Sequence, residues 1–207
     1  MADQIRQYRM QRRAESQLET RRRITESAVE LHGTLGPART SMSAVAAHAG
    51  VRRSTLYRHF PDEAALFDAC SAHWAAANPP PDLAAWAAID QPDARLARAL
   101  EELYAFYARV APMLANLIRD EQTEPVVRER FGAFHGYLDA AGDTLLAGRR
   151  VRGAARRRVR GALGHAVAFS TWHSLVKEQG LEPEDARRLM EALVDAAGAR
   201  PVVRSAP

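Results

Sequence analysis

Apolar residues recur every three or four positions along most of the chain, and no segment shows the strict alternation of apolar and polar residues that marks a half-buried strand. The pattern therefore predicts an all-helical protein. A first helix is expected over residues 19–35, where four apolar side chains fall on one face, namely Ile24, Ala28, Leu31 and Leu35. The dipeptide Gly36-Pro37 ends this helix, because proline cannot continue it.

Two short helices are expected over residues 41–50 and 53–60, the earlier one capped by Ser41 or Ser43. A fourth helix starts at the acidic pair Asp62-Glu63, which suits the positive end of a helix dipole.

The three prolines of NPPPDL, residues 78–83, interrupt any helix and mark a boundary or a tight bend. Further helices are expected at about 92–110, 111–121, 125–147, 154–179 and 183–197. The first dozen and the last ten residues carry little apolar patterning, so we expect both ends to fray.

Gly50 stands between two predicted helices that are separated by only three residues. Glycine adopts the left-handed conformation that such a sharp connection requires. Ala46 provides a small side chain where the helices cross, and Val51 fills the inside of the turn. A minimal core with the first helix is completed by Val45, Leu56 and Phe60. This arrangement predicts a helix-turn-helix, whose second helix enters the major groove of DNA.

Positive charge is concentrated at the N-terminal end. Residues 1–60 hold 11 arginines against 5 acidic residues, whereas residues 61–207 hold 18 basic and 20 acidic residues. Basic segments attract polyanions, foremost nucleic acid and then acidic membrane surfaces. The arginines at positions 12, 13 and 21–23 form either the solvated face of an extended first helix or an arm that reaches phosphates or the minor groove. Arginines 149–160 form either a solvated surface or another DNA contact.

Composition narrows the class of protein further. The 207 residues are 47% apolar and include one cysteine, Cys70, whose apolar surroundings favour a buried thiol over a redox sensor. No apolar run is long enough to span a membrane, and the arginine-rich start lacks the apolar core of a signal peptide. We therefore expect a cytoplasmic protein.

The segment SMSAVAAHAGVRRSTLYRHFPDEAALF, residues 41–67, resembles the signature of TetR-type transcriptional repressors. The similarity lies in the hydroxyl that opens the second helix, the alanine-glycine turn, the Thr-Leu-Tyr recognition helix and its aromatic end. The segment WHSLVKEQGLEPEDARRLMEALVDA is similar to the closing helix pair of the family. The resemblance implies an all-α protein with an N-terminal three-helix DNA-binding domain and a larger helical ligand-binding and dimerisation domain. The expected divisions are a basic extension over 1–18, the helix-turn-helix domain over 19–66, the larger domain over 67–200 and a disordered tail over 201–207.

Matching the family position by position implies eight DNA-binding residues: Ser41, Arg52, Arg53, Ser54, Thr55, Tyr57, Arg58 and His59. Ser41, Tyr57 and His59 would contact phosphates. Arg53 is our first candidate for base reading, because an arginine that bonds guanine twice discriminates by about 1–3 kcal/mol. The alternatives are a core aromatic for Tyr57, a surface histidine for His59 and a solvated charge for Arg58.

Two positions depart from the family pattern. Arg52 stands where a small polar residue is usual, and Glu63 stands where a lysine usually donates to phosphate. A carboxylate at that position would repel the DNA backbone. An unusual operator or an altered affinity is therefore expected.

Large apolar side chains concentrate after residue 90, where ordinary core packing is the simplest interpretation. The resemblance implies a small-molecule pocket between these helices. The candidate ligand-binding residues are Tyr104, Tyr107, Met113, Leu117, Phe131, Phe134, His135, Phe169 and Trp172. A dimer seam is expected on helices 154–179 and 183–197, with the candidates Leu163, Val167, Trp172, Leu189, Leu193 and Val194.

Together these implications describe a repressor that binds a palindromic operator as a homodimer, is released by a mainly apolar small molecule and needs no cofactor or metal. Catalysis is not expected, because no Glu-x-x-His pair, phosphate loop or nucleophile motif is present. The alternative is a constitutive regulator or a protein-interaction module on the same fold.

Overall fold

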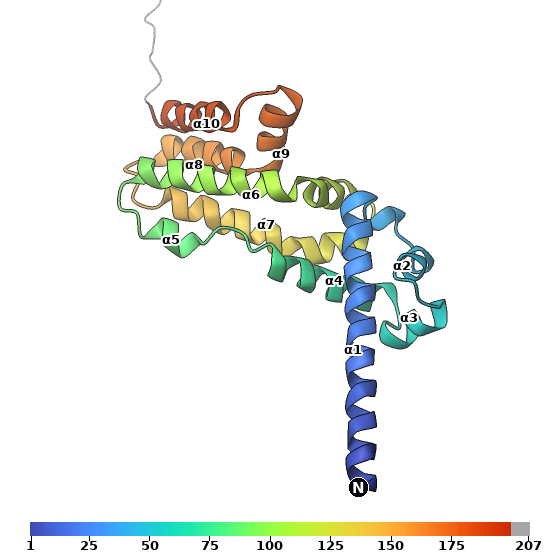
Figure 1. Cartoon of the computed structure of the whole chain (residues 1–207). Coiled ribbons are helices and arrows are strands. Elements are labelled where there is room, and N and C mark those ends of the chain that lie inside the picture. Colours follow the sequence, from blue (N-terminus) through green and yellow to red (C-terminus); the bar gives the residue numbers. More distant parts are fainter. Residues whose placement is uncertain (200–207) are drawn as a thin grey trace, which may run out of the picture. The chain divides into compact units, whose positions relative to one another are not determined.

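A computed structural model describes residues 1–199, and every regular element in that range is a helix, as the sequence predicts. The chain forms two compact units (Figure 1). Unit 1 contains Met1–Pro79 and Pro112–Phe131, and unit 2 contains Pro80–Ala111 and the chain from Gly132 onward. The predicted tail over 201–207 lies outside the described residues.

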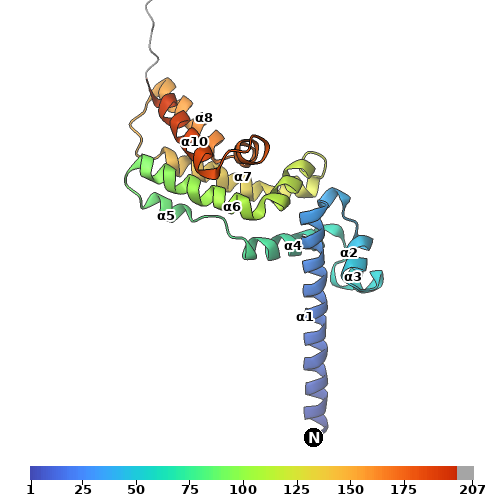
Figure 2. The ribbon, with the colours of Figure 1, turned by 45° about the horizontal axis from the view of Figure 1, so that its top comes forward.

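Unit 1 is built on a long first helix. Its elements are α1 (Ala2–Thr34), the 3₁₀ turn η1 (Pro37–Arg39), α2 (Met42–His48), α3 (Arg53–His59), α4 (Glu63–Ala77), the end of α6 (Pro92–Asp120) and the start of α7 (Pro125–Leu146). In both views α2 and α3 lie beside α1 (Figures 1 and 2). Their shared core includes Ile24, Ala28, Val45, Leu56, Phe60, Phe67 and Val127. The predicted face of the first helix is therefore confirmed at Ile24 and Ala28.

The first helix is longer than its apolar pattern predicts. We expected a helix over 19–35 with a frayed start, but α1 is helical from Ala2. The additional turns are rich in glutamine and arginine, which favour helices. Because the docked half already supplies the costly helix nucleus, extension toward the N-terminus costs little.

The second, third and fourth helices form as predicted. Ser41 is the N-cap of α2, and its Oγ accepts a hydrogen bond from the Ala44 amide at 3.1 Å. Asp62 caps α4 in the same way, with its Oδ1 2.8 Å from the Ala65 amide nitrogen.

Unit 2 contains α5 (Leu83–Ala87), most of α6 and α7, α8 (Gly153–Val167), α9 (Phe169–Trp172), the π-helical turn η2 (His173–Glu178) and α10 (Pro183–Gly198). Helices α8 and α10 lie side by side (Figure 2). The largest buried side chains of this unit include Trp86, Leu96, Leu100, Phe106, Tyr107, Leu145, Leu163 and Trp172. The sequence pattern did not predict the five-residue helix α5.

Two predicted helix boundaries are wrong. The helices expected over 92–110 and 111–121 form one helix, α6, with Pro112 inside it. Pro112 and Ala108 are both exposed, so water can hydrate the carbonyl that the proline leaves without a donor. The single helix expected over 154–179 is interrupted at Ala168, whose backbone is extended.

Tyrosine hydroxyls stabilise the interruption at Ala168. The Tyr104 hydroxyl donates to the Ala166 carbonyl at 3.1 Å, and the Tyr107 hydroxyl donates to the Val167 carbonyl at 2.5 Å. These carbonyls belong to the last turn of α8, where no following amide satisfies them. Burial raises the pKa of both tyrosines, so the hydroxyls remain protonated donors.

Candidate DNA-binding surface

The turn between α2 and α3 is fixed by backbone hydrogen bonds around Gly50. Gly50 has φ +63°, a conformation that favours glycine. Its amide donates to the Ala47 carbonyl at 3.1 Å, and the Val51 amide donates to the Ala46 carbonyl at 2.9 Å. This pair of bonds is the Schellman ending of a helix, and Val51 packs against the unit 1 core as the motif usually requires. The predicted role of Gly50 is confirmed.

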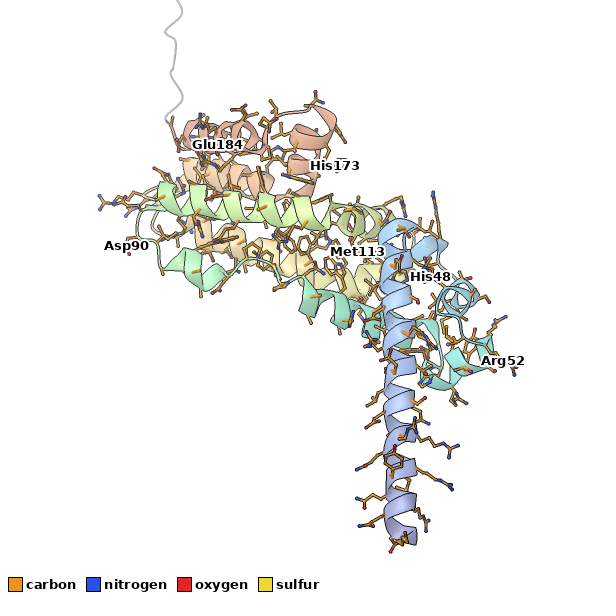
Figure 3. The ribbon with its side chains drawn as sticks, in the orientation of Figure 1. His48, Arg52, Asp90, Met113, His173 and Glu184 are labelled. Carbon is orange, nitrogen blue, oxygen red and sulfur yellow. The ribbon has the colours of Figure 1, made fainter. Side chains whose placement is uncertain are left out.

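Burial then sets which face of α3 points outward. Leu56 and Phe60 are both 0% exposed and anchor α3 in the core of unit 1. The opposite side carries the exposed residues Arg52, Arg53, Ser54, Tyr57 and Arg58, with Thr55 and His59 half-buried at its margins. Arg52 lies at the outer edge of the motif (Figure 3). Seven of the eight predicted DNA-binding residues therefore share one surface.

Within this surface, Arg53 and Tyr57 form a pair one helical turn apart. Arg53 Nη2 lies 3.3 Å from the Tyr57 hydroxyl, and the guanidinium carbon lies 5.4 Å from the centre of the Tyr57 ring. Tyr57 is 38% exposed, so it is not a core aromatic. The tyrosine pre-orients the arginine while leaving most of its donors free.

The margins of the surface carry groups suited to phosphate. Ser41 accepts the Ala44 amide through its oxygen and keeps its hydroxyl proton available for donation. The pKa of His59 is lowered by partial burial and by the nearby charges of Arg58 and Arg21. His59 is therefore neutral near pH 7 and offers one ring N–H. Glu63 is exposed in the first turn of α4.

Arg21 contributes to this surface in a way that the sequence did not indicate. Its Nη1 donates to the His59 carbonyl at 2.6 Å, and its guanidinium carbon lies 4.1 Å from the centre of the Phe60 ring. A cation at the C-terminal end of a helix satisfies a free carbonyl and the negative end of the dipole. Arg21 thus holds the end of α3 rather than lying on a solvated face. The contact spans 38 residues, so no local pattern reveals it.

The predicted ligand-binding residues are divided between the two units. In unit 2, the rings of Tyr107, Phe169 and Trp172 form one cluster, with centroids 5.3 Å apart for Tyr107–Phe169 and 5.8 Å apart for Tyr107–Trp172. Tyr104, Phe134 and His135 also belong to unit 2, whereas Met113, Leu117 and Phe131 belong to unit 1. A pocket formed by these nine residues stays a prediction.

One buried polar atom in the aromatic cluster lacks a partner. The indole nitrogen of Trp172 is buried, and no hydrogen bond to it is formed within the described chain. Buried N–H groups are nearly always satisfied in folded proteins, so an isolated one is a candidate donor to a bound molecule.

The candidate dimer residues fall into a buried group and an exposed group. Leu163, Val167, Trp172 and Val194 are buried within one chain, which removes them from a surface between chains. Leu189 and Leu193 are 48% and 39% exposed, and they lie one turn apart on α10.

Three further features of the described chain concern metal binding, membrane insertion and the cysteine. Residues 1–199 contain no group of three or more His, Cys, Asp or Glu side chains arranged to hold a metal ion. None of the described helices is both long and apolar enough to cross a bilayer. Cys70 is 2% exposed, and burial raises the pKa of its thiol to about 12, which confirms the predicted buried thiol.

Comparison with known proteins agrees with this geometry. Residues 24–70, which include the turn and α3, match the family model described as bacterial regulatory proteins, tetR family. A search of proteins with curated functions found no match.

Solved structures share the fold. A candidate fatty acid metabolism regulator of Clostridium perfringens has a TM-score of 0.62 and 15% identity, covering 86% of this chain and 98% of its own. A candidate TetR-family regulator of Mesorhizobium loti has a TM-score of 0.60 and 18% identity, and the match covers 87% of this chain and 96% of its own. The multidrug binding protein EbrR, complexed with imidazole, has a TM-score of 0.51 and 22% identity, and the match covers 90% of this chain and 93% of its own. Residues 24–70 therefore form a helix-turn-helix of the tetR family type, and the chain as a whole shares the helical fold of these solved structures.

Proposed function

We propose that the protein is a repressor that binds a palindromic operator as a homodimer and is released by a mainly apolar small molecule. The observation that carries the proposal is the outward face of α3, which is basic and hydroxyl-bearing while Leu56 and Phe60 anchor the opposite face. Such a helix enters the major groove with its N-terminal side chains at the base edges.

The proposed contacts follow from side-chain chemistry. Arg53 reads a guanine through two hydrogen bonds, with Tyr57 supporting its guanidinium. Ser54 and Thr55 supply adaptable hydroxyl contacts. Arg52 and Arg58 add charge that offsets the carboxylate of Glu63. Phosphates are bound by the remaining residues, Ser41, Tyr57 and His59.

The aromatic cluster of unit 2 supports an apolar effector. Its buried rings would form an apolar lining around a bound molecule, and the unpartnered indole N–H of Trp172 would donate one directional hydrogen bond to it. Small-molecule sites commonly combine an apolar lining with a few such polar groups. We therefore expect the effector to carry a hydrogen-bond acceptor on a largely apolar body.

The end of α6 supports a route from effector to DNA. Helix α6 is continuous from unit 2 into unit 1. Within unit 1, the Asn116 amide donates to the carbonyls of His32 and Gly33 at 3.0 and 2.9 Å. The Arg119 guanidinium donates to the Leu35 carbonyl at 2.9 Å. These bonds tie α6 to the end of α1, so a shift of α6 would move the helix that carries α2 and α3.

The proposal is tested by selecting duplexes from a random pool with the full-length protein and measuring binding at several salt concentrations. A palindromic site is expected, with half-sites about 34–36 Å apart, and its affinity should fall steeply with salt. Release of the protein from DNA is then assayed with compounds that carry a hydrogen-bond acceptor on a largely apolar body. Fatty acids and multidrug substrates are tested first, because the names of two solved structures with the same fold suggest these classes. Absence of binding at low salt would favour a protein-interaction module, and binding that no compound weakens would favour a constitutive regulator.

A further inference from the structure

The N-terminal half of α1 is a helix without a core. Every described side chain from Met1 to Glu19 is exposed, and this part of α1 extends beyond α2 and α3 in both views (Figures 1 and 2). We call residues 1–18 the basic arm. At about 1.5 Å per residue, its helical part over residues 2–18 is about 25 Å long. The large apolar side chains described along its length, Tyr8, Met10 and Leu18, are all exposed, so the arm gains little from burial in its own chain and is free to bind a partner outside it.

Charge is unevenly distributed around the arm. Residues 4–13 contain four arginines and no acidic residue. At about 100° per residue, Arg6, Arg9 and Arg13 fall within about 60° of one another on the helix surface. None of the ion pairs formed by described residues involves these three arginines. By contrast, Arg22 in the docked half is paired at 2.7 Å with both Glu19 and Glu26.

The arginine face lies on the side of α1 that packs against the core of unit 1. Arg6 and Arg13 precede Ile24 and Leu31 by 18 residues each, which is five full turns of an α-helix. Ile24 is buried in the core of unit 1, and Leu31 packs against that core. The arginines therefore project on the side of α1 that packs against the core formed with α2, α3 and α4. Arg21, which bonds the end of α3, marks where the docked part of α1 begins.

We propose that the basic arm lies along the phosphate backbone beside the operator and that Arg6, Arg9 and Arg13 each bind a phosphate there. Duplex DNA fits the arm because the arm carries a single sign of charge on one face, and because that face continues the side of α1 against which the helix-turn-helix packs. Guanidinium groups match phosphate geometry through paired hydrogen bonds. This inference rests on the proposed function, since α3 must first bring the protein to DNA.

The test compares two full-length triple variants that lose the same charge. One carries Arg6→Gln, Arg9→Gln and Arg13→Gln, and the control carries Arg150→Gln, Arg156→Gln and Arg157→Gln, which lie exposed in unit 2. The probe is the selected duplex with about one helical turn, or 10 base pairs, of added flank on each side. Each phosphate contact contributes about 0.9 to the slope of log affinity against log salt.

Loss of the arm contacts should reduce that slope by about 2.7 per protomer, or about 5 per dimer. The arm variant should also lose protection of the flanks in a footprint while retaining the centre. The control variant should keep both the slope and the flank protection, and Arg6→Lys, Arg9→Lys, Arg13→Lys should retain most of the slope because lysine keeps the charge. All substituted side chains are exposed, so the fold is retained, and thermal unfolding checks this.

An unchanged slope in the arm variant, or equal changes in both triple variants, would overturn the inference while leaving the proposed function intact. A wild-type protein that binds no duplex would overturn both. Vesicles containing phosphatidylserine provide the remaining comparison: if the arm substitutions abolish vesicle binding and leave DNA binding unchanged, the arm is a membrane contact and the inference is wrong.

Discussion

Arg21 joins α1 to the end of α3 through a hydrogen bond to the His59 carbonyl and a stacking contact with Phe60. Arg21→Ala removes both contacts, so we expect the free energy of unfolding to fall by about 1 kcal/mol. Affinity for DNA should fall as well, because the end of α3 loses its support. Chemical denaturation and operator titration measure the two effects. Arg23→Ala, an exposed arginine on the same helix, is the control and should change neither quantity by a comparable amount.

Arg53 and Tyr57 should differ in how their loss affects sequence preference. Arg53→Ala should relax discrimination between the selected operator and a scrambled duplex by about 1–3 kcal/mol, because a base contact is lost. Tyr57→Phe removes a hydroxyl assigned to phosphate, so it should weaken binding to both duplexes more evenly. Binding isotherms on the two duplexes measure the preference. Equal losses for Arg53→Ala on both would refute its role in base reading.

His32 should make stability depend on pH. Its side chain is 7% exposed, and burial lowers its pKa from the ordinary 6.5 to about 4, with the Asp120 carboxylate opposing the change. Between these values the unfolded chain binds the additional proton, so stability is complete above pH 6.5 and is lost as the pH falls toward 4. We expect wild type to lose about 2 kcal/mol more than His32→Leu between pH 7 and pH 4.5. Urea titrations at both pH values measure this, and parallel losses would contradict it.

The exposure of a side chain was predictable where it depends on neighbours in sequence. The exposure of Arg52, Arg53 and Ser54 follows from the apolar spacing of α3, which places Leu56 and Phe60 on the opposite face. The capping of α3 by Arg21 and the burial of His32 beside Cys70 were not predictable, because each contact spans 38 residues. Local periodicity contains no information about such pairs.

At the scale of the element, Tyr107 determines how α8 ends. The chain from 154 to 179 has helical periodicity throughout, which is why one helix was predicted. The interruption at Ala168 depends on hydroxyl donors from α6, including the 2.5 Å bond from Tyr107 to the Val167 carbonyl. Tyr107→Phe leaves that buried carbonyl with one fewer donor, so we expect a loss of about 1–2 kcal/mol. Urea unfolding measures it, with Tyr8→Phe, at an exposed tyrosine, as control. An unchanged midpoint for Tyr107→Phe would show that the bond does not stabilise the fold.

Helix boundaries show a second limit of sequence pattern. Pro112 predicted a break that does not occur, because the proline sits on the exposed side of α6 where its steric and hydrogen-bonding costs are smallest. Gly50 predicted a turn that does occur, because the left-handed conformation there is stabilised by two backbone hydrogen bonds. A proline or glycine therefore predicts the end of a helix reliably only when the structure around it is known.

At the scale of the whole molecule, the helical class and the exposed basic face of α3 were predictable, whereas the packing of distant segments was not. Residues 112–131 join the N-terminal unit although they follow it by more than thirty residues. Asn116 and Arg119 carry this association through hydrogen bonds to backbone carbonyls. Backbone acceptors are present at every position, so such bonds leave no mark in the partner's sequence.

The proposed homodimer makes the final prediction. Leu189 and Leu193 form an exposed apolar patch on α10, and Met190 and Val194 are buried on the other face of this helix. Burying a leucine contributes about 1.5–3 kcal/mol, and twofold symmetry uses each residue twice. Leu189→Glu with Leu193→Glu should therefore weaken self-association by at least about 100-fold. Analytical ultracentrifugation measures this, and Leu18→Glu, a leucine exposed on α1, is the control.

The same double variant should lose cooperative binding to the palindrome while retaining weak binding to a half-site. The reason is that α3 is unchanged and only the link between the two DNA-binding domains is lost. If the variant remains dimeric, the α10 surface is not the seam. If it becomes monomeric and still binds the full palindrome with wild-type affinity, a single DNA-binding domain is sufficient for recognition. In that case, binding to the palindrome does not require a dimer.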